Sequence, residues 1–202
     1  MPPRRQVAAS ARRPGGRSAS VRRRVLDAVC ALLTEFGYDA LSVDAVADRS
    51  GAHRTTVYRR WGDVGGLLAD VLAEATGADW RAPDTGSLHG DLVAVNREIY
   101  TALTADPPIT AALIAASFRS EQAAKALHIF WADRYDRCVR IVRRATQRGE
   151  IPARTDPRRL LIAATSPLYH EMVLLRTPAS SHLAEQSALD AAIAARAGAF
   201  AG

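Results

Sequence analysis

The chain has 202 residues, of which 48% are hydrophobic and 6% aromatic, and its formal net charge is +6 at pH 7. A chain of this length buries a core without disulfide support, which excludes a disulfide-stapled mini-protein and predicts one domain or two small ones. Apolar stretches fall short of the roughly 18 residues that a membrane-spanning helix needs, so we expect a soluble protein with no membrane partner.

Basic residues are concentrated at the amino end. Residues 1–24 hold eight arginines and no acid, whereas the remainder has 19 bases and 21 acids. Residues 1–19 contain little to bury, which predicts a disordered basic arm suited to a polyanion such as nucleic acid. A tail that only improves solubility is the alternative. Because Pro14 and two glycines replace the apolar region of a secretion signal, we expect a cytoplasmic protein in which Cys30 and Cys138 are buried and reduced.

Helices are predicted from Ser20 onward, and the alanine-rich, aromatic-poor composition favours helices over sheets. Ser20 is a good N-cap residue, and apolar residues then recur at helical spacing until Gly37. Gly51 separates two unusually short helices, and a fourth helix follows Asp63. The expected ranges are 20–36, 42–50, 53–61 and from 64 to about 76.

The stretch 77–87 contains Gly77, Pro83 and Gly86 and has no apolar period, so it predicts a hinge between a small N-terminal unit and a larger body. We expect the body to be helical as well, with Pro167 kinking its fourth helix. The helices of the body are predicted at 88–103, 108–118, 121–148, 156–176 and 181–197.

The two short helices form a predicted helix-turn-helix motif. Ala47 is small enough for close helix approach, Gly51 can adopt positive φ at the turn, and Val57 fastens the second helix to the core. The opposite face of that helix is polar and cationic. Threonine can meet base edges and arginine can bind guanine or phosphate, so this face suits the DNA major groove. Its residues are Arg54, Thr55, Thr56, Arg59 and Arg60.

Further features accompany the motif: Phe36-Gly37-Tyr38 ends the first helix, Leu41-Ser42-Val43 precedes the second, Tyr58 and Trp61 lie in the third, and Leu67-Leu68 lie in the fourth. With them, residues 20–77 resemble the DNA-binding domain of the TetR family of transcriptional regulators. The resemblance implies that Thr55 and Thr56 face bases and that Tyr58 donates to a phosphate. The full set of DNA contacts that it implies is Ser42, Val43, His53, Arg54, Thr55, Thr56, Tyr58, Arg59 and Arg60.

Two positions depart from the family pattern. His53 stands where the family usually has a serine N-cap, so we expect a weaker cap on the third helix. Val64 stands where a lysine commonly touches phosphate. The basic arm of residues 1–19 could compensate for this loss along the phosphates or in the minor groove.

The resemblance also implies a small-molecule pocket within the C-terminal body, and the scarce aromatic residues of that body are its candidate lining. An ordinary core is the alternative for the same residues. The candidates are Tyr100, Phe118, Trp131, Tyr135, Tyr169 and His170.

The last two helices are expected to form a dimer interface, as in the family. Their small and apolar residues would be exposed in a monomer, and small residues permit close helix approach. The candidates are Leu168, Met172, Leu175, Ala184, Ala188, Ala191, Ala192 and Ala195. Arginines at 134, 137, 140, 144 and 148 form another helical stripe, which we interpret as a solvated face because acids interleave it.

The predicted fold is therefore all-α, with an N-terminal three-helix helix-turn-helix domain at 20–77 and a larger helical ligand-binding and dimerisation domain at 78–202. The resemblance implies a one-component regulator, by default a repressor, that binds a palindromic operator as a homodimer and is released by a small, mainly apolar ligand. A constitutive architectural DNA-binding protein and a small α-helical enzyme are the alternatives. Neither the five histidines nor the cysteines show ligand spacing, and we expect no catalytic residue, metal or cofactor.

Overall fold

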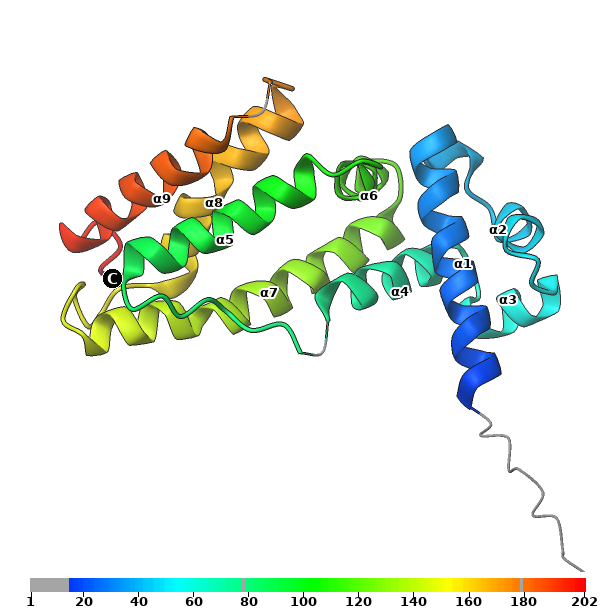
Figure 1. Cartoon of the computed structure of the whole chain (residues 1–202), viewed down its shortest axis with the longest axis horizontal. Coiled ribbons are helices and arrows are strands. Elements are labelled where there is room, and N and C mark those ends of the chain that lie inside the picture. The colour runs from blue at the N-terminus through cyan, green and yellow to red at the C-terminus, as the bar shows by residue number, and fades with distance from the viewer. Residues whose placement is uncertain (1–14, 78, 179) are drawn as a thin grey trace, which may run out of the picture.

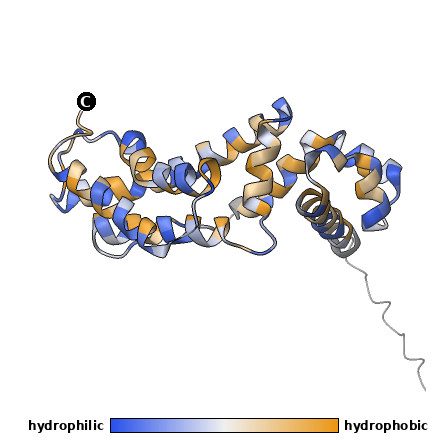
Figure 2. Ribbon diagram, turned by 90° about the horizontal axis from the view of Figure 1, so that it is seen from above, coloured by the Kyte–Doolittle hydropathy of each residue, from blue (hydrophilic) through white to orange (hydrophobic). Residues whose placement is uncertain are grey.

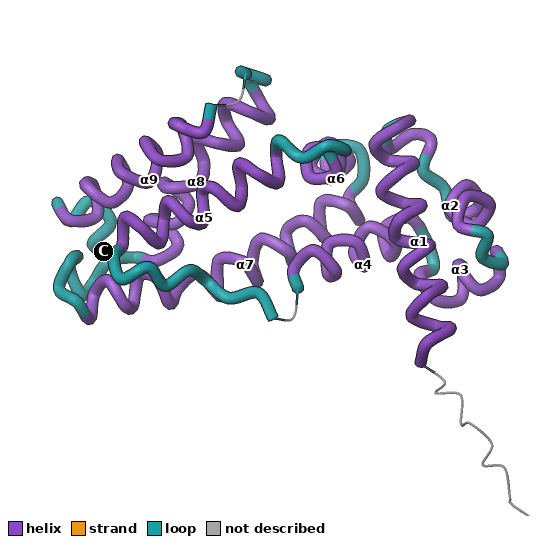
Figure 3. Tube along the Cα trace, viewed as in Figure 1, coloured by secondary structure: helices purple, strands orange, loops and turns teal. Residues whose placement is uncertain are grey.

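The computed structural model describes residues 15–77, 79–178 and 180–202. Within those ranges the regular elements are helices (Figure 1), and Figure 3 draws no strand there, which confirms the predicted all-α class. The helices are α1 (Gly15–Phe36), α2 (Val43–Ser50), α3 (Arg54–Trp61), α4 (Val64–Thr76), α5 (Leu88–Leu103), α6 (Ile109–Ser117), α7 (Glu121–Gln147), α8 (Pro157–Tyr169) and α9 (Ser181–Arg196). Short 3₁₀ and π turns cover Tyr38–Ala40 and His170–Leu174.

Helix α1 begins five residues earlier than predicted. Residues 15–19 are helical, so the expectation of disorder up to residue 19 is wrong for them, whereas residues 1–14 lie outside the described residues. Ser18 Oγ accepts a 3.2 Å hydrogen bond from Arg60 Nη1, which ties the added turn to α3. Extending a helix that has already formed costs little, so one such contact is enough to stabilise another turn.

The helix-turn-helix follows the caps that its residues predict. Ser42 Oγ accepts from the Ala45 amide at 3.0 Å and starts α2, and Gly51, at φ 65°, ends it. Ala47 and Val57 are fully buried between the helices, as their roles in the motif require. Asp63 starts α4 by accepting from the Gly66 amide at 2.9 Å.

Two separate cores hold the chain together. The first joins α1–α4 to α6 and to the amino half of α7, where Ala123 and Ala126 are buried. The second joins α5, α8 and α9 to the carboxyl half of α7, where Cys138 and Ile141 are buried. In Figure 2, apolar residues recur along the helices of both parts between polar ones. The border between the cores therefore crosses α7 rather than the stretch 77–87.

The stretch that precedes α5 is held against α7 by arginines. Arg137 Nη1 donates to the carbonyls of Gly77 and Trp80 at 3.1 and 3.2 Å, and Arg144 donates to the Pro83 carbonyl. Arg134 places its guanidinium 3.9 Å from the centre of the Trp80 ring. The interpretation of this stripe as a solvated face is thus wrong for these three arginines, because an irregular segment needs side-chain partners for its backbone carbonyls.

Helix α8 ends earlier than predicted. It stops at Tyr169, two residues after Pro167, and the chain continues through the wide turn of His170–Leu174 instead of one kinked helix to Arg176. Helix α9 then packs on α5 and α8 (Figure 1). The buried Asn96 amide on α5 donates to the carbonyls of Ala164 and Ala184 at 2.9 and 3.0 Å, so it ties the three helices at one point.

Neither cysteine is in a disulfide. Cys138 is buried, and burial raises the pKa of its thiol to about 11. Cys30 is only half-buried, so the expectation that both thiols are buried is wrong for Cys30. None of the described helices is both long and apolar enough to cross a membrane.

Candidate nucleic-acid interface

Helix α3 lies at one end of the molecule (Figure 1), and one of its faces is polar. Val57 and Trp61 point into the first core. On the other side Thr55, Tyr58 and Arg59 are exposed, Tyr58 to 49%. A short helix with one buried stripe and an exposed face of hydroxyl and guanidinium groups has the form needed to enter a major groove.

Arg54 is engaged within the motif. Its Nη2 lies 3.0 Å from Asp48 Oδ2, and its Nε lies 3.6 Å from Asp44 Oδ1, so it bridges α3 to α2. The hydrogen bond with Asp48 and the nearby Asp44 charge raise the pKa of Arg54. The predicted base or backbone contact of Arg54 therefore competes with two carboxylates of the same chain.

Arg60 also has partners in the chain. Besides its bond to Ser18, its guanidinium lies 5.0 Å from the centre of the Trp61 ring. Arg59 has neither a hydrogen bond nor an ion pair among the described residues and is exposed. Of the three arginines predicted on this face, Arg59 is the one whose charge is fully available to an outside partner.

The amino end of α2 is the second part of the surface. Ser42 is exposed, and its hydroxyl caps the helix. The Val43 side chain is buried, with 6% exposed, so the prediction of Val43 as a contact is wrong for its side chain. Only its backbone amide, at the first position of the helix where no intrahelical acceptor exists, can reach an anion there.

The two departures from the family pattern have structural consequences. His53 makes no side-chain hydrogen bond to the amino end of α3, which confirms the weaker cap. Val64 is half-buried and packs against the first core, so it contributes stability at a position where the family has a phosphate-binding lysine. Thr56, predicted to face a base, is half-buried.

Helix α3 is anchored at its carboxyl end. Asp70 on α4 accepts hydrogen bonds from Trp61 and from Arg22 of α1. Burial alone would raise the pKa of Asp70, but the hydrogen bonds from Arg22 and Trp61 outweigh it and hold the pKa below its usual value. One carboxylate on α4 thus ties the end of α3 to α4 and to α1.

A cavity of about 260 Å³ is lined mainly by the C-terminal body and also by Leu72 and Ala75 of α4. Three of the predicted lining residues, Trp131, Tyr135 and Tyr169, lie in its wall. The Trp131 ring lies 5.2 Å from Tyr169 and 6.0 Å from Tyr135, centre to centre. With the aliphatic residues beside them they make the wall of the cavity mainly apolar.

Three predicted lining residues lie elsewhere. Phe118 is 74% exposed and borders a neighbouring open groove with Leu174. Tyr100 is half-buried outside the cavity, and His170 is exposed. Sequence reasoning missed Trp80 and Arg134, which do line the cavity. Trp80 comes from the irregular stretch before α5, where helical periodicity gives no signal.

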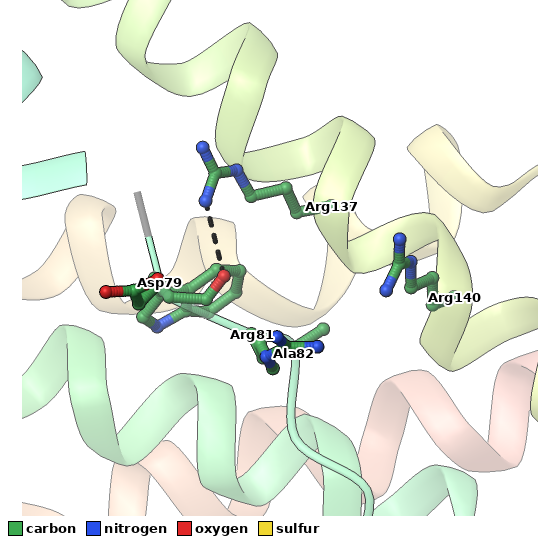
Figure 4. A pocket seen from close by; sticks show the side chains of 6 residues that line it. Asp79, Arg81, Ala82, Arg137 and Arg140 are labelled. Atoms are coloured by element: carbon green, nitrogen blue, oxygen red, sulfur yellow. Dashed lines mark hydrogen bonds between the residues drawn. The ribbon is translucent and has the colours of Figure 1, made fainter. Parts of the chain in front are cut away.

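A second, more polar hollow lies beside that stretch (Figure 4). It is lined by Asp79, Trp80, Arg81 and Ala82 from the irregular segment and by Arg137 and Arg140 from α7. The dashed line in Figure 4 starts from Arg137, which donates to the backbone of the segment as described above. Trp80 lines both hollows.

The predicted dimer surface is largely interior. Five alanines and Leu168 are buried within the single chain, so the expectation that they would be exposed in a monomer is wrong. They are Ala184, Ala188, Ala191, Ala192, Ala195 and Leu168. Small residues permit close packing with any neighbour, and here the neighbours of α9 are α5 and α8. Met172 is half-buried, and Leu175 is exposed as predicted.

The large apolar side chains that α8 and α9 do expose are not among the predicted dimer residues. They are Ile162 on α8 and Leu189 and Ile193 on α9. Ile193 is the most exposed of them, at 55%. These residues lie on neighbouring helices, because α8 and α9 pack together.

Comparison with known proteins covers most of the described chain. Residues 25–71 match the family described as "Bacterial regulatory proteins, tetR family", and residues 82–191 match "Tetracyclin repressor-like, C-terminal domain". The transcriptional regulator AqdR of Rhodococcus erythropolis is 38% identical over 167 residues, which cover 80% of this chain and 78% of that protein. YdeS of Bacillus subtilis, described as an uncharacterized HTH-type transcriptional regulator, is 24% identical over 160 residues, 78% of this chain and 81% of that protein.

Solved structures share the fold. A TetR transcriptional regulator from Agrobacterium tumefaciens superposes with a TM-score of 0.65 at 20% identity, covering 85% of this chain and 92% of that one. SmeT, solved in complex with triclosan, superposes with a TM-score of 0.59 at 20% identity, covering 87% of this chain and 91% of that one.

Proposed function

Because the chain belongs to the TetR family of transcriptional regulators, which are DNA-binding proteins rather than enzymes, we propose that it is a repressor that binds a palindromic operator as a homodimer. A small, mainly apolar effector that enters the cavity lined by Trp131, Tyr135 and Tyr169 releases it from DNA. The observation that carries the proposal is the exposed polar face of α3 above a fully buried Val57.

Several contacts support the DNA-binding part. Thr55 and Arg59 are exposed on α3, and Tyr58 projects beside them. Ser42 and the free amides at the start of α2 supply a second point for a phosphate. In this arrangement Thr55 reads base edges, while Tyr58 and Arg59 bind backbone or guanine.

The dimer is supported by Ile162, Leu189 and Ile193, which leave apolar surface on α8 and α9 uncovered. A two-fold pair of chains would bury this surface and place two α3 helices in successive major grooves, about 34 to 36 Å apart. Palindromic half-sites follow from this symmetry.

Effector control is supported by where the cavity lies. Its lining includes Leu72 and Leu113 of the first core and Cys138 and Leu161 of the second. A bound effector therefore contacts both the part that carries α3 and the part built on the second core. The structural relative SmeT was solved with a small molecule, triclosan. An effector that favours a spacing unsuited to DNA would couple the two sites by about 1 to 3 kcal/mol.

The test begins by selecting bound sequences from random duplexes with the full-length protein, which yields the operator. Affinity is then measured for the protein as it is, for Thr55→Ala and for Arg59→Ala, with Arg81→Ala as the control because Arg81 is an exposed arginine far from α3 in the chain. Thr55→Ala should relax preference at one base position by about 1 to 3 kcal/mol, and Arg59→Ala should weaken binding. Arg81→Ala should bind as the unchanged protein does. A single-chain protein that binds every duplex equally at low salt would refute the proposal, and a specific binder that no small molecule releases would instead be a constitutive DNA-binding protein.

A further inference from the structure

The effector cavity has one half-buried cation, Arg134, in a mainly apolar wall. Most of its lining is aromatic or aliphatic, and its two charged residues are Glu98 of α5 and Arg134 of α7. The Arg134 guanidinium lies 3.9 Å from the centre of the Trp80 ring and 5.4 Å from that of Phe130. Aromatic faces hold the plane of the guanidinium in place but do not accept its N–H bonds in full.

The hydrogen bonds of Arg134 are incomplete. Its Nη1 is buried and has no hydrogen-bond partner, and its Nη2 reaches only the Ala75 carbonyl, at 3.4 Å. Nearby carboxylates are occupied elsewhere: Asp133 lies 2.8 Å from Arg137, and Glu98 accepts from the Trp80 indole at 2.9 Å. Arg134 forms no ion pair within the described ranges of the chain.

A buried cationic donor without an acceptor is costly, and native proteins normally satisfy such groups. Burial lowers the pKa of Arg134, although an arginine remains protonated under ordinary conditions. An acceptor atom that enters the cavity beside this guanidinium would therefore gain a charge-assisted hydrogen bond inside an otherwise apolar site.

We propose that Arg134 is the polar anchor of the effector site and that the effector is a small aromatic molecule bearing one oxygen acceptor, either a carbonyl or an oxyanion. This inference rests on the proposed function, in which the cavity binds the effector. An apolar cavity of about 150 Å³ holds one benzene ring. The 260 Å³ found here fits one or two rings with a single polar substituent.

The same residue links the cavity to the DNA-binding unit. Ala75 lies in the last turn of α4, which packs beside α3, and Trp80 lies in the segment that joins α4 to α5. An effector oxygen that binds this guanidinium shifts its position relative to the Ala75 carbonyl, which Nη2 reaches at only 3.4 Å, so occupancy changes the contact between α7 and the end of α4. The guanidinium of Arg134 thereby couples effector binding to release from DNA.

Three probes of similar shape test the anchor: naphthalene has no acceptor, 2-acetylnaphthalene adds a neutral carbonyl, and 2-naphthoate adds an anion. Their dissociation constants are measured by calorimetry on the full chain and on Arg134→Met, which removes the donors but keeps much of the length of the side chain. Arg140→Met is the matched control, because Arg140 is on the same helix but outside the cavity.

The unchanged protein and Arg140→Met should bind 2-acetylnaphthalene, 2-naphthoate or both at least about tenfold more tightly than naphthalene. Arg134→Met should bind all three about equally. Arg134→Gln, which keeps donors but loses the charge, serves if Arg134→Met does not fold, and it should lose the preference for 2-naphthoate. Comparison of the two oxygen-bearing probes shows whether the neutral or the anionic acceptor fits beside Glu98.

A preference for acceptors that survives in Arg134→Met, or failure of all three probes to bind the unchanged protein, would overturn the anchor. Operator binding measured on the same samples separates this from the proposed function. Probe binding that depends on Arg134 in a protein without a preferred DNA sequence would refute the regulator and keep the anchor.

Discussion

The indole Nε1 of Trp61, the last residue of α3, donates a 2.8 Å hydrogen bond to Oδ2 of Asp70 on α4. Arg22 of α1 donates to the same carboxylate at 2.8 to 3.2 Å. Replacing Asp70 with Asn should therefore lower the free energy of unfolding by about 1 to 2 kcal/mol. The substitution removes the negative charge and weakens the hydrogen bonds from Trp61 and Arg22 at a partly buried site. Urea unfolding measures this. Glu74→Gln is the control: Glu74 also pairs with Arg22 but is more exposed, and its loss should cost under about 0.5 kcal/mol. Equal effects of the two variants would contradict the role given to Asp70.

The same carboxylate predicts a pH dependence. Its pKa in the folded chain is below the ordinary value of 3.8, since the hydrogen bonds from Arg22 and Trp61 outweigh the effect of burial. The unfolded state thus takes up its proton first as the pH falls, and the stabilisation by Asp70 is full well above the ordinary pKa and lost as the pH falls through the folded-state pKa. The stability difference between the unchanged protein and Asp70→Asn should be constant from about pH 7 to pH 5 and shrink below about pH 4. A difference that grows on acidification would contradict this.

Gly66 permits a close approach that no other residue can make. A Cβ built on it would lie 2.0 Å from the Trp61 carbonyl oxygen, which is backbone and cannot move aside. Gly66→Ala should destabilise the chain by more than about 2 kcal/mol, although alanine is the better helix former. Ala69→Gly, at an exposed position of α4, serves as the matched control and should cost about 1 kcal/mol from helix propensity alone. Thermal and urea unfolding compare them, and a neutral Gly66→Ala would show that the turn after α3 is not so tightly fixed.

The proposed dimer predicts that a charge on the exposed apolar surface of α8 and α9 prevents dimerisation. Ile193→Glu places a charge among exposed apolar side chains of α8 and α9 and should convert a dimer into monomers, as measured by light scattering. Ile129→Glu is the control, because Ile129 is exposed to a similar degree on α7 and should leave the dimer intact. If Ile193→Glu remained dimeric, the interface would lie elsewhere.

The basic arm predicts a salt effect. Residues 2–13 contain four arginines, so their deletion should weaken binding to all duplexes. It should also flatten the dependence of log affinity on log salt, by up to about 0.9 for each phosphate that the arm neutralises in the full-length protein. Affinity measured at several salt concentrations checks this with both the operator and an unrelated duplex. An unchanged slope would mean that the arm does not bind phosphate.

Local signals in the sequence predict most of the fold. Ser42, Gly51 and Asp63 act on their own neighbours, so the boundaries they predict for α2 and α4 agree closely with the structure. Tertiary partners are harder to predict. The predicted start of α1 is too late because Ser18 is bound by Arg60, 42 residues away.

The candidate site is predicted unevenly for the same reason. The exposed face of α3 follows from helical spacing around Val57, since one buried residue fixes which side faces out. The alanines of α9 carry no such information, because a small side chain packs equally well against its own chain or a partner. The sequence places Arg134 on the surface, since charge alone does not show that Trp80 and the Ala75 carbonyl lie against it.

Helix α7 passes unbroken from one core to the other: Ala126 is buried with α1–α4, and Cys138, about three turns later, is buried with α5, α8 and α9. No flexible joint lies along this path within the described helix. A tilt of one half of α7 therefore moves the other half with it, because the helix is continuous. Cutting the chain between Thr76 and Leu88 would accordingly separate α1–α4 from the α6 and α7 residues that complete their core, and in the uncut chain the two cores should melt in a single transition.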